Sequence, residues 1–238
     1  MSKSVNINSI LPNGDCGLVL QFEEAPHLLL VIHALAAELI DNPFPGMINV
    51  IPGKDTLVMV FASPINELAA NGWSVFRDDI NLRIKSVNPC FIKTKTHEIP
   101  VCYDATVAVD VVWVCEQLGL SHEQLIDCHT EEIYQVDMLG FLPGFAYLSG
   151  NQSTLNIARK QTPSLRVPAG SVAIANQQTG IYSLASPGGW YVIGRTPLAL
   201  IDWQREQQPM LLKPMDQVQF KSISLSEYNR LMSDADGH

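Results

Sequence analysis

The chain has 238 residues, of which 47% are hydrophobic and 16% charged, a composition typical of a globular protein with a substantial core. Its formal net charge of −9 excludes general nucleic-acid binding, which requires a basic surface. The five cysteines show no C-x-x-C spacing and are odd in number, so they indicate neither a zinc site nor a disulfide framework. The chain starts without an apolar signal segment, and its most apolar helix candidate, 27–40, is too short to span a bilayer. We therefore expect a cytoplasmic protein with no membrane partner.

The first part of the chain has the pattern of a small α+β domain. Residues 18–22 predict a strand, and Pro26 opens a helix with an apolar stripe. Residues 47–51 and 56–62 predict a hairpin, and a second helix is expected to start at Ser63. This order of strand, helix, two strands and helix predicts a split βαβ sandwich. Because no cluster of catalytic side chains occurs here, we expect a structural or interfacial role.

The pattern changes near residues 86–96, where Asn-Pro and mixed polar residues indicate a boundary. We therefore predict an α+β N-terminal domain over 1–92 and a second domain over 93–238. The last residues, 226–238, predict a helical stub that frays into a polar end.

The second domain is expected to begin with one strand and two helices and to continue as strands. Residues 97–103 predict the strand, and residues 110–118 predict the first helix. Ser121 and Gln124 have the spacing of a capping box for the second helix. Beyond residue 134, short apolar runs alternate with Pro and Gly turns, which predicts a β-barrel or a compact sandwich.

Residues 139–201 contain no Asp or Glu, although about six would be expected in proportion to the 24 acids of the chain. The same stretch holds eight of the fifteen glycines and the cations Arg159, Lys160, Arg166 and Arg195. Arg can bind a carboxylate or phosphate through two parallel hydrogen bonds, and Gly lets backbone N–H groups approach a ligand. We therefore expect this acid-free stretch to bind an anionic ligand.

The arginines of the acid-free stretch have alternative explanations. Arg159 and Arg166 either contact a ligand or pair with acids from the first half of the chain. Arg195 is followed by Thr196, and a guanidinium with a neighbouring hydroxyl can hold a carboxylate or phosphate oxygen.

Other polar residues of this region are weaker candidates. Gln178 and Thr179 offer an amide and a hydroxyl that could orient a ligand. Ser171 is a poor candidate nucleophile, because no base can be placed beside it from the sequence. His129 is either a general acid or base, or a partly buried histidine stabilised by the C-terminus of its helix. Most glycines and aromatic residues here are explained by turns and barrel packing.

Four motifs carry a resemblance to a known family. They are GFLPGFAYL at 140–148, VPAGSVAIA at 167–175, QTGIY at 178–182, and SPGGW followed by IGRTP at 186–197. In this order they resemble the family that groups the B-type subunit of 5-oxoprolinase, the kinase inhibitor KipI and the first subunit of allophanate hydrolase. The resemblance covers essentially the whole chain and implies an α+β N-terminal domain followed by a cyclophilin-like β-barrel.

The chain departs from the family pattern at three places. Positions 158–159 and 163–164 hold Ala-Arg and Pro-Ser where the family usually has Pro-Arg, and 108–111 reads AVDV in place of Gly-Pro-Asp-Leu. The missing Arg of the second pair removes one expected ligand contact, which Arg166 is close enough to replace. The motif that contains Arg195 is intact.

The resemblance implies a subunit of an ATP-dependent 5-oxoprolinase, which opens the lactam of 5-oxo-L-proline to L-glutamate with A-type and C-type partner subunits. An unstrained lactam is a poor electrophile, and phosphorylation of its carbonyl oxygen would activate it. That step needs donors for the developing charge and an anchor for the substrate carboxylate. Arg166 and Arg195 are the candidates for charge, Gln178 and Thr179 for orientation, and His129 for proton transfer.

Three alternatives follow from the same resemblance. One is an inhibitor that binds a sensor histidine kinase through apolar barrel surface and blocks phosphotransfer. Another is a subunit of an allophanate or urea amidohydrolase. The third, prolyl isomerisation, rests on the cyclophilin-like fold alone and ranks last, because a fold does not imply a function.

Overall fold

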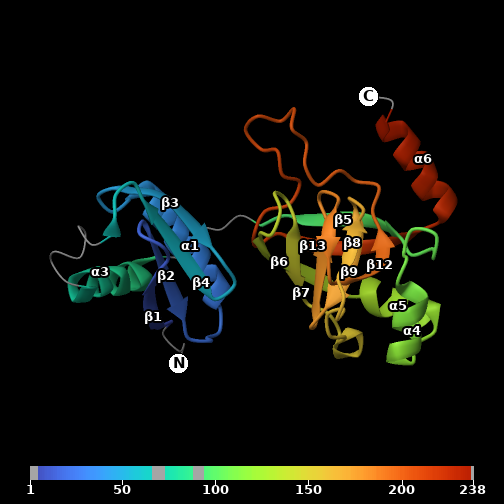
Figure 1. Cartoon of the computed structure of the whole chain (residues 1–238), viewed down its shortest axis with the longest axis horizontal. Coiled ribbons are helices and arrows are strands. Elements are labelled where there is room, and N and C mark those ends of the chain that lie inside the picture. Colours follow the sequence, from blue (N-terminus) through green and yellow to red (C-terminus); the bar gives the residue numbers. More distant parts are fainter. Residues whose placement is uncertain (1–4, 66–72, 88–93, 237–238) are drawn as a thin grey trace. The chain divides into compact units, whose positions relative to one another are not determined.

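The structure is a computed structural model that describes residues 5–65, 73–87 and 94–236 (Figure 1). The chain folds into two compact units, Met1–Lys93 and Thr94–His238. No helix of the described residues is long and apolar enough to cross a membrane.

The first unit is built on a four-stranded antiparallel sheet. The order β1-β2-β4-β3 places β4 between two parallel strands, β2 and β3, which helix α1 connects. This arrangement confirms the predicted split βαβ unit. The bounds are β1 (Ile7–Pro12), β2 (Gly17–Phe22), α1 (Leu28–Asp41), β3 (Met47–Pro52) and β4 (Thr56–Phe61).

The core of the first unit lies on one face of this sheet. Alternate residues of β2 and β4, among them Leu20 and Leu57, are fully buried against the apolar stripe of α1. Helix α3 (Trp73–Ser86), which no sequence pattern predicted, adds the buried Ile80 to this core. Strand β1 was also not predicted. The helix expected from Ser63 is described only at Ile65, and its remainder lies outside the described residues.

The second unit is a closed seven-stranded barrel, which confirms the predicted barrel (Figure 1). The strands follow the order β10-β7-β6-β13-β5-β12-β9; β13 and β5 pair in parallel, and the other neighbours are antiparallel. The bounds are β5 (Thr96–Cys102), β6 (Ile133–Leu139), β7 (Ala146–Ser149), β9 (Ser171–Ala175), β10 (Gln178–Ile181), β12 (Tyr191–Arg195) and β13 (Gln217–Ile223). A short ribbon, β8 (Ser164–Val167) with β11 (Ser186–Gly188), forms a separate two-stranded sheet, and a 3-10 turn, η3, spans Ser153–Leu155.

Three helices accompany the barrel. Helix α4 (Val111–Leu118) ends at Gly119, whose φ of 65° is the left-handed conformation that glycine adopts without steric cost. Helix α5 (His122–Thr130) begins with the predicted capping box, in which Ser121 and Gln124 each bond the other's backbone N–H. The C-terminal residues form the predicted helix, α6 (Leu225–Asp236), and the last two residues of the predicted 226–238 lie outside the described residues.

The barrel wall separates two apolar clusters. Side chains such as Val172, Ile174 and Ile193 fill the interior, whereas their sequence neighbours belong to a second cluster on the outer face of β7, β10, β9 and β12. We call this the outer aromatic cluster, because it contains four aromatic side chains: Phe145, Tyr147, Tyr182 and Trp190.

Gly180 on β10 permits this outer packing. A Cβ at this position would lie 2.7 Å from Phe145 Cζ and 2.9 Å from Trp190 Cζ3, so the two rings pack directly on the strand backbone. Any larger residue here would displace two buried aromatic rings.

We predict that Gly180→Ala lowers the free energy of unfolding by about 1–3 kcal/mol, because the added methyl group overpacks the outer aromatic cluster. Gly189→Ala is the matched control, since the nearest atom to its added Cβ would be 3.8 Å away. Urea unfolding of both variants checks this. Equal stability of the two variants would contradict the close packing at Gly180.

Candidate functional site

The structure does not bring the eight predicted site residues into one place. His129 and Thr179 lie in the barrel interior, with Gln178 beside them at the start of β10. Two arginines lie among the β8 and β11 segments of the outer face, and the remaining three residues meet where β9 and β12 pair. The two arginines are Arg159 and Arg166, and the last three residues are Ser171, Arg195 and Thr196.

His129 is part of a buried hydrogen-bonded chain inside the barrel. Its Nδ1 lies 2.7 Å from the Tyr103 hydroxyl, and its Nε2 lies 3.2 Å from Thr179 Oγ1. Thr179 in turn donates to Asn151 Oδ1 at 2.8 Å. Because the Thr179 proton is used on Asn151, Thr179 accepts from Nε2–H, and His129 Nδ1 accepts from Tyr103.

This environment keeps the His129 ring neutral. The ring is fully buried and stacks on Phe220, with centroids 4.4 Å apart. Burial lowers the pKa of His129 to about 3, because the imidazolium form would lose its hydration. Burial likewise raises the pKa of Tyr103 well above its usual value, so its hydroxyl stays protonated as a donor. The sequence left open a general acid or base and a partly buried histidine at a helix C-terminus; the ring is more deeply buried than the second explanation expected.

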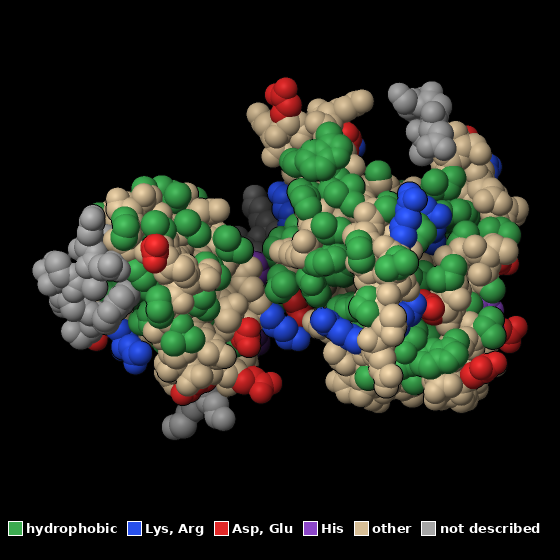
Figure 2. Space-filling view, viewed as in Figure 1, with side chains coloured by type: hydrophobic (Ala, Val, Ile, Leu, Met, Phe, Trp, Pro, Cys, Tyr) green, Lys and Arg blue, Asp and Glu red, His purple; other side chains and the backbone are tan. Residues whose placement is uncertain are grey.

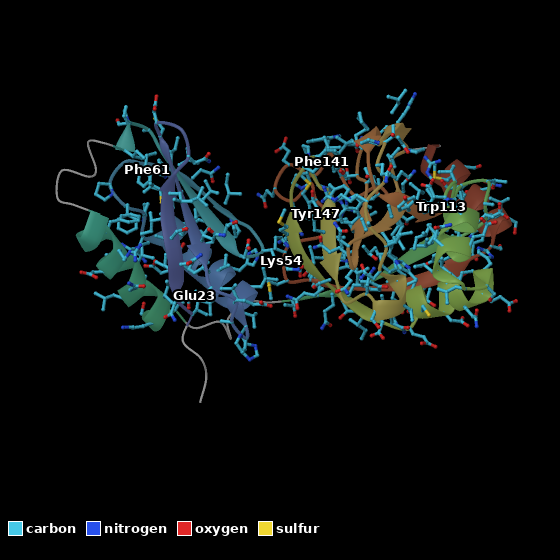
Figure 3. All side chains as sticks on the ribbon, turned by 60° about the horizontal axis from the view of Figure 1, so that its bottom comes forward. Glu23, Lys54, Phe61, Trp113, Phe141 and Tyr147 are labelled. Carbon is cyan, nitrogen blue, oxygen red and sulfur yellow. The ribbon has the colours of Figure 1, made fainter. Side chains whose placement is uncertain are left out.

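Arg159 lies on the outer aromatic cluster. Its guanidinium is 5.7 Å from the centre of the Trp190 ring, within cation–π range. Its positive charge favours the ionised forms of Tyr147 and Tyr182, although burial dominates and raises the pKa of both. Figure 3 shows Tyr147 toward the same side of the barrel as Phe141, away from Trp113.

The neighbouring cation has a structural role. Lys160 Nζ lies 2.7 Å from Asp110 Oδ2 and 2.9 Å from Ser164 Oγ, and Asp110 also accepts from the backbone N–H of Val192. Lys160 thus joins the start of α4 to β8, and Asp110 joins it to β12. Arg166 is exposed on β8. Among the described residues, no acid forms an ion pair with Arg159, Arg166 or Arg195. Figure 2 shows basic side chains set among hydrophobic ones on the barrel.

Arg195 lies in a row of side chains that crosses three strands. It is the cross-strand partner of Ser171 on β9 and of Cys102 on β5. Directly opposite residues of antiparallel strands share one face of the sheet, with Cβ atoms about 5 Å apart. Tyr228 of α6 lies near enough for the charge of Arg195 to lower its pKa, against a larger upward effect of burial. We call Ser171, Arg195, Cys102 and Tyr228 the Arg195 cluster.

The loop before β9 orients the Arg195 guanidinium. Arg195 Nε donates to the Ala169 carbonyl at 2.9 Å, which leaves both Nη groups for another acceptor. Gly170 has a φ of 80°, and a Cβ there would clash with the Thr196 carbonyl oxygen, so only glycine allows this approach. Thr196 is buried and its hydroxyl accepts from the backbone N–H of Leu198, which makes it part of the loop structure.

The Arg195 cluster presents hydrogen-bond donors with one positive charge. Ser171 and Tyr228 are 0% and 4% exposed, and neither hydroxyl has a hydrogen-bond partner among the described residues. Arg195 is half-buried, so part of its side chain faces solvent. Such a set is suited to a small anion. The sequence had indicated Ser171 and Arg195, but not Cys102 or Tyr228, which are distant along the chain and belong to no local motif.

A separate pocket of about 490 Å³ lies along residues 198–211. It is lined by Ile201, Trp203 and Leu211 among others, and its charged residues, Asp202 and Arg205, pair with each other at 2.9 Å. None of the predicted site residues lines it. In the part of the chain that the structure describes, no group of three His, Cys, Asp or Glu side chains could hold a metal ion.

Comparison with known proteins shows close similarity over most of the chain. The family described as "Carboxyltransferase domain, subdomain C and D" matches residues 8–212. The B-type subunit of 5-oxoprolinase from Bacillus subtilis (strain 168) is 36% identical over 224 residues, which cover 91% of this chain and 93% of the relative. The same subunit from Escherichia coli O157:H7 is 35% identical, covering 87% and 92%. The crystal structure of TTHA0988 superposes with a TM-score of 0.72 at 34% identity, covering 87% of this chain and 40% of that chain.

We predict that stability falls by about 2 kcal/mol between pH 7 and pH 5 through His129 alone. The unfolded chain takes up a proton at His129 below about pH 6.5, whereas the folded chain does so only near pH 3, so acid favours the unfolded state. Urea unfolding at both pH values measures this difference. It should shrink by this amount in His129→Gln and persist in His27→Asn, whose histidine is exposed. An unchanged difference in His129→Gln would rule out a neutral buried ring.

Proposed function

This chain belongs to the family of 5-oxoprolinase B-type subunits, and from this membership we propose that it is a subunit of an ATP-dependent 5-oxoprolinase. The complex would open the lactam of 5-oxo-L-proline to give L-glutamate. The observation that carries the proposal is the 36% identity to the Bacillus subtilis protein, which extends over 91% of this chain and 93% of the relative. This match covers residues of both compact units, so the similarity is not limited to the barrel.

The Arg195 cluster supports an amino-acid-derived substrate. 5-Oxo-L-proline carries one carboxylate, and the cluster offers one guanidinium whose two Nη groups are not used by Ala169. We therefore propose that Arg195 binds substrate charge. Arg166 and Arg159 have no ion pair with a described acid, and they are the further cations that could meet a partner or ligand on the outer face.

The interior residues are better explained as positioning residues. Thr179 and His129 lie in the barrel interior, and their polar atoms are already used in bonds to each other, to Tyr103 and to Asn151. We propose that they hold β10 against α5, and we assign no proton-transfer role to His129. Gln178, half-buried at the start of β10, stays a candidate for orienting substrate.

ATP is assigned to partner subunits in this proposal. A Mg²⁺-bound triphosphate carries several negative charges and needs several cations or backbone N–H groups around it. The Arg195 cluster carries one cation and matches a monoanionic group. The partners are proposed to be the A-type and C-type subunits of the oxoprolinase. Binding of a sensor histidine kinase stays a prediction, which a pull-down with the kinase dimerisation domain would decide.

We predict that this chain, mixed with its A-type and C-type partner subunits, converts 5-oxo-L-proline to L-glutamate in the presence of ATP. Steady-state assays of glutamate and ADP release measure this. Mixtures that omit this chain or ATP should show no turnover. If the complete mixture left 5-oxo-L-proline unchanged, the proposed function would be wrong.

In the same assay, we predict that Arg195→Ala lowers kcat/KM about 100-fold or more, because a positioned donor for substrate charge is lost. Arg230→Ala serves as the control, since Arg230 is exposed on α6 and pairs with Asp234. Full activity of the Arg195 variant would remove Arg195 from the site.

A further inference from the structure

The geometry points to Tyr228 of α6 and Ser171 of β9 as binding residues that, with Arg195, hold the carboxylate of the cyclic-amide substrate. This inference deepens the proposed function and rests on it. Neither the order of residues along the chain nor the family match assigns Tyr228, because the match ends at residue 212 and α6 begins at Leu225.

Strand pairing brings Tyr228 to Arg195. Strand β13 pairs with β5 in parallel, so that Ile223 lies beside Cys102 at the end of both strands. Helix α6 starts two residues later and packs against β5. Cys102 is in turn the partner of Arg195 on β12. The first turn of α6 is therefore held above the row formed by Cys102, Arg195 and Ser171.

The hydroxyl groups of Ser171 and Tyr228 form no hydrogen bond within the described structure. Ser171 is fully buried and Tyr228 is 4% exposed. A buried hydroxyl without a partner destabilises a fold, because the hydrogen bonds that it made to water are not replaced. Ser171 is the cross-strand partner of Arg195, and Tyr228 lies within reach of the Arg195 charge, so one acceptor supplied by a ligand would explain both hydroxyls.

The charge of the cluster selects a monoanion. Arg195 is its only cation, and residues 139–201, which supply Ser171, Arg195 and the adjoining loop, contain no acid. A planar carboxylate can accept two parallel bonds from the Arg195 Nη groups and one from each hydroxyl, which uses its lone pairs fully. A phosphate dianion has two negative charges, and Arg195 would neutralise only one of them. We therefore assign a carboxylate, and 5-oxo-L-proline presents one beside its lactam ring.

The test measures binding of 5-oxo-L-proline to the full chain by titration calorimetry. 2-Pyrrolidinone, which has the lactam but no carboxylate, and inorganic phosphate are titrated in parallel. We expect 5-oxo-L-proline to bind at least tenfold more tightly than either. Tyr228→Phe and Ser171→Ala should each weaken its binding about tenfold, because each removes one hydrogen bond to a charged group.

Two matched variants act as controls. Tyr134→Phe removes another buried tyrosine hydroxyl, which lies inside the barrel, and Arg230→Gln removes an exposed cation on α6. Both should bind 5-oxo-L-proline as the wild type does. Thermal unfolding of every variant verifies that it is folded. A second readout is steady-state turnover with the partner subunits, in which Tyr228→Phe should raise KM about tenfold and leave kcat within about twofold.

Several results would overturn the inference. They are no binding of 5-oxo-L-proline to the wild-type chain, equal binding of 2-pyrrolidinone, tighter binding of phosphate, or wild-type affinity in Tyr228→Phe. Each of these can occur while the reconstituted mixture still turns over 5-oxo-L-proline, and then only the site assignment fails. Absence of turnover in the wild-type mixture, with binding intact, would instead reject the proposed function and leave an anion site on the chain.

Discussion

The parallel pairing of β5 with β13 is the constraint on which the second unit depends. It joins the first strand of this unit to its last, over seven residue pairs from Thr96 with Gln217 to Cys102 with Ile223. Without it, β5 and β13 would each leave a row of unpaired backbone groups at an open sheet edge. Because β13 ends beside Cys102, the same pairing also determines where α6 can pack.

Closure of the barrel divides its polar residues into two sets with different chemistry. Inside, Tyr103, His129 and Thr179 satisfy one another, and burial keeps the imidazole neutral. At the edge of the wall, Arg195 bonds Ala169 through Nε only, so both of its Nη groups can donate to another acceptor. The hydroxyl groups of Ser171 and Tyr228 have no hydrogen-bond partner within the described ranges. The first set stabilises the fold, and the second remains chemically available. The strand alternation that fills the barrel interior thus decides which polar residues can meet a ligand.

The acid-free stretch has a physical explanation in this arrangement. Strands β7, β9 and β12 contribute to both the interior core and the outer aromatic cluster, so they have few positions where a carboxylate would be hydrated. Its Lys160 pairs with Asp110 from outside the stretch, whereas Arg159 instead lies over Trp190. An acid placed beside Arg195 would neutralise the one cation of its cluster. Packing therefore explains much of the absence of Asp and Glu from this stretch. A consequence of that absence is that the positive charge of Arg195 is not neutralised by a neighbouring acid among the described residues.

Local patterns were enough to predict the elements of the split βαβ unit, the capping box of Ser121 and Gln124, and the end of α4 at Gly119, because each depends on neighbours a few residues apart. The short strands beyond residue 134 fitted a barrel or a sandwich, and the family resemblance favoured the barrel. No clear sequence pattern predicted helix α3 or the full length of α6. Composition and spaced arginines indicated an anion site, and the ranking of Arg195 needed no tertiary contact. Only the tertiary structure placed His129 out of reach of solvent and Tyr228 beside Arg195. These positions follow from the pairing of residues more than 90 apart, such as Cys102 with Arg195, which no local spacing records.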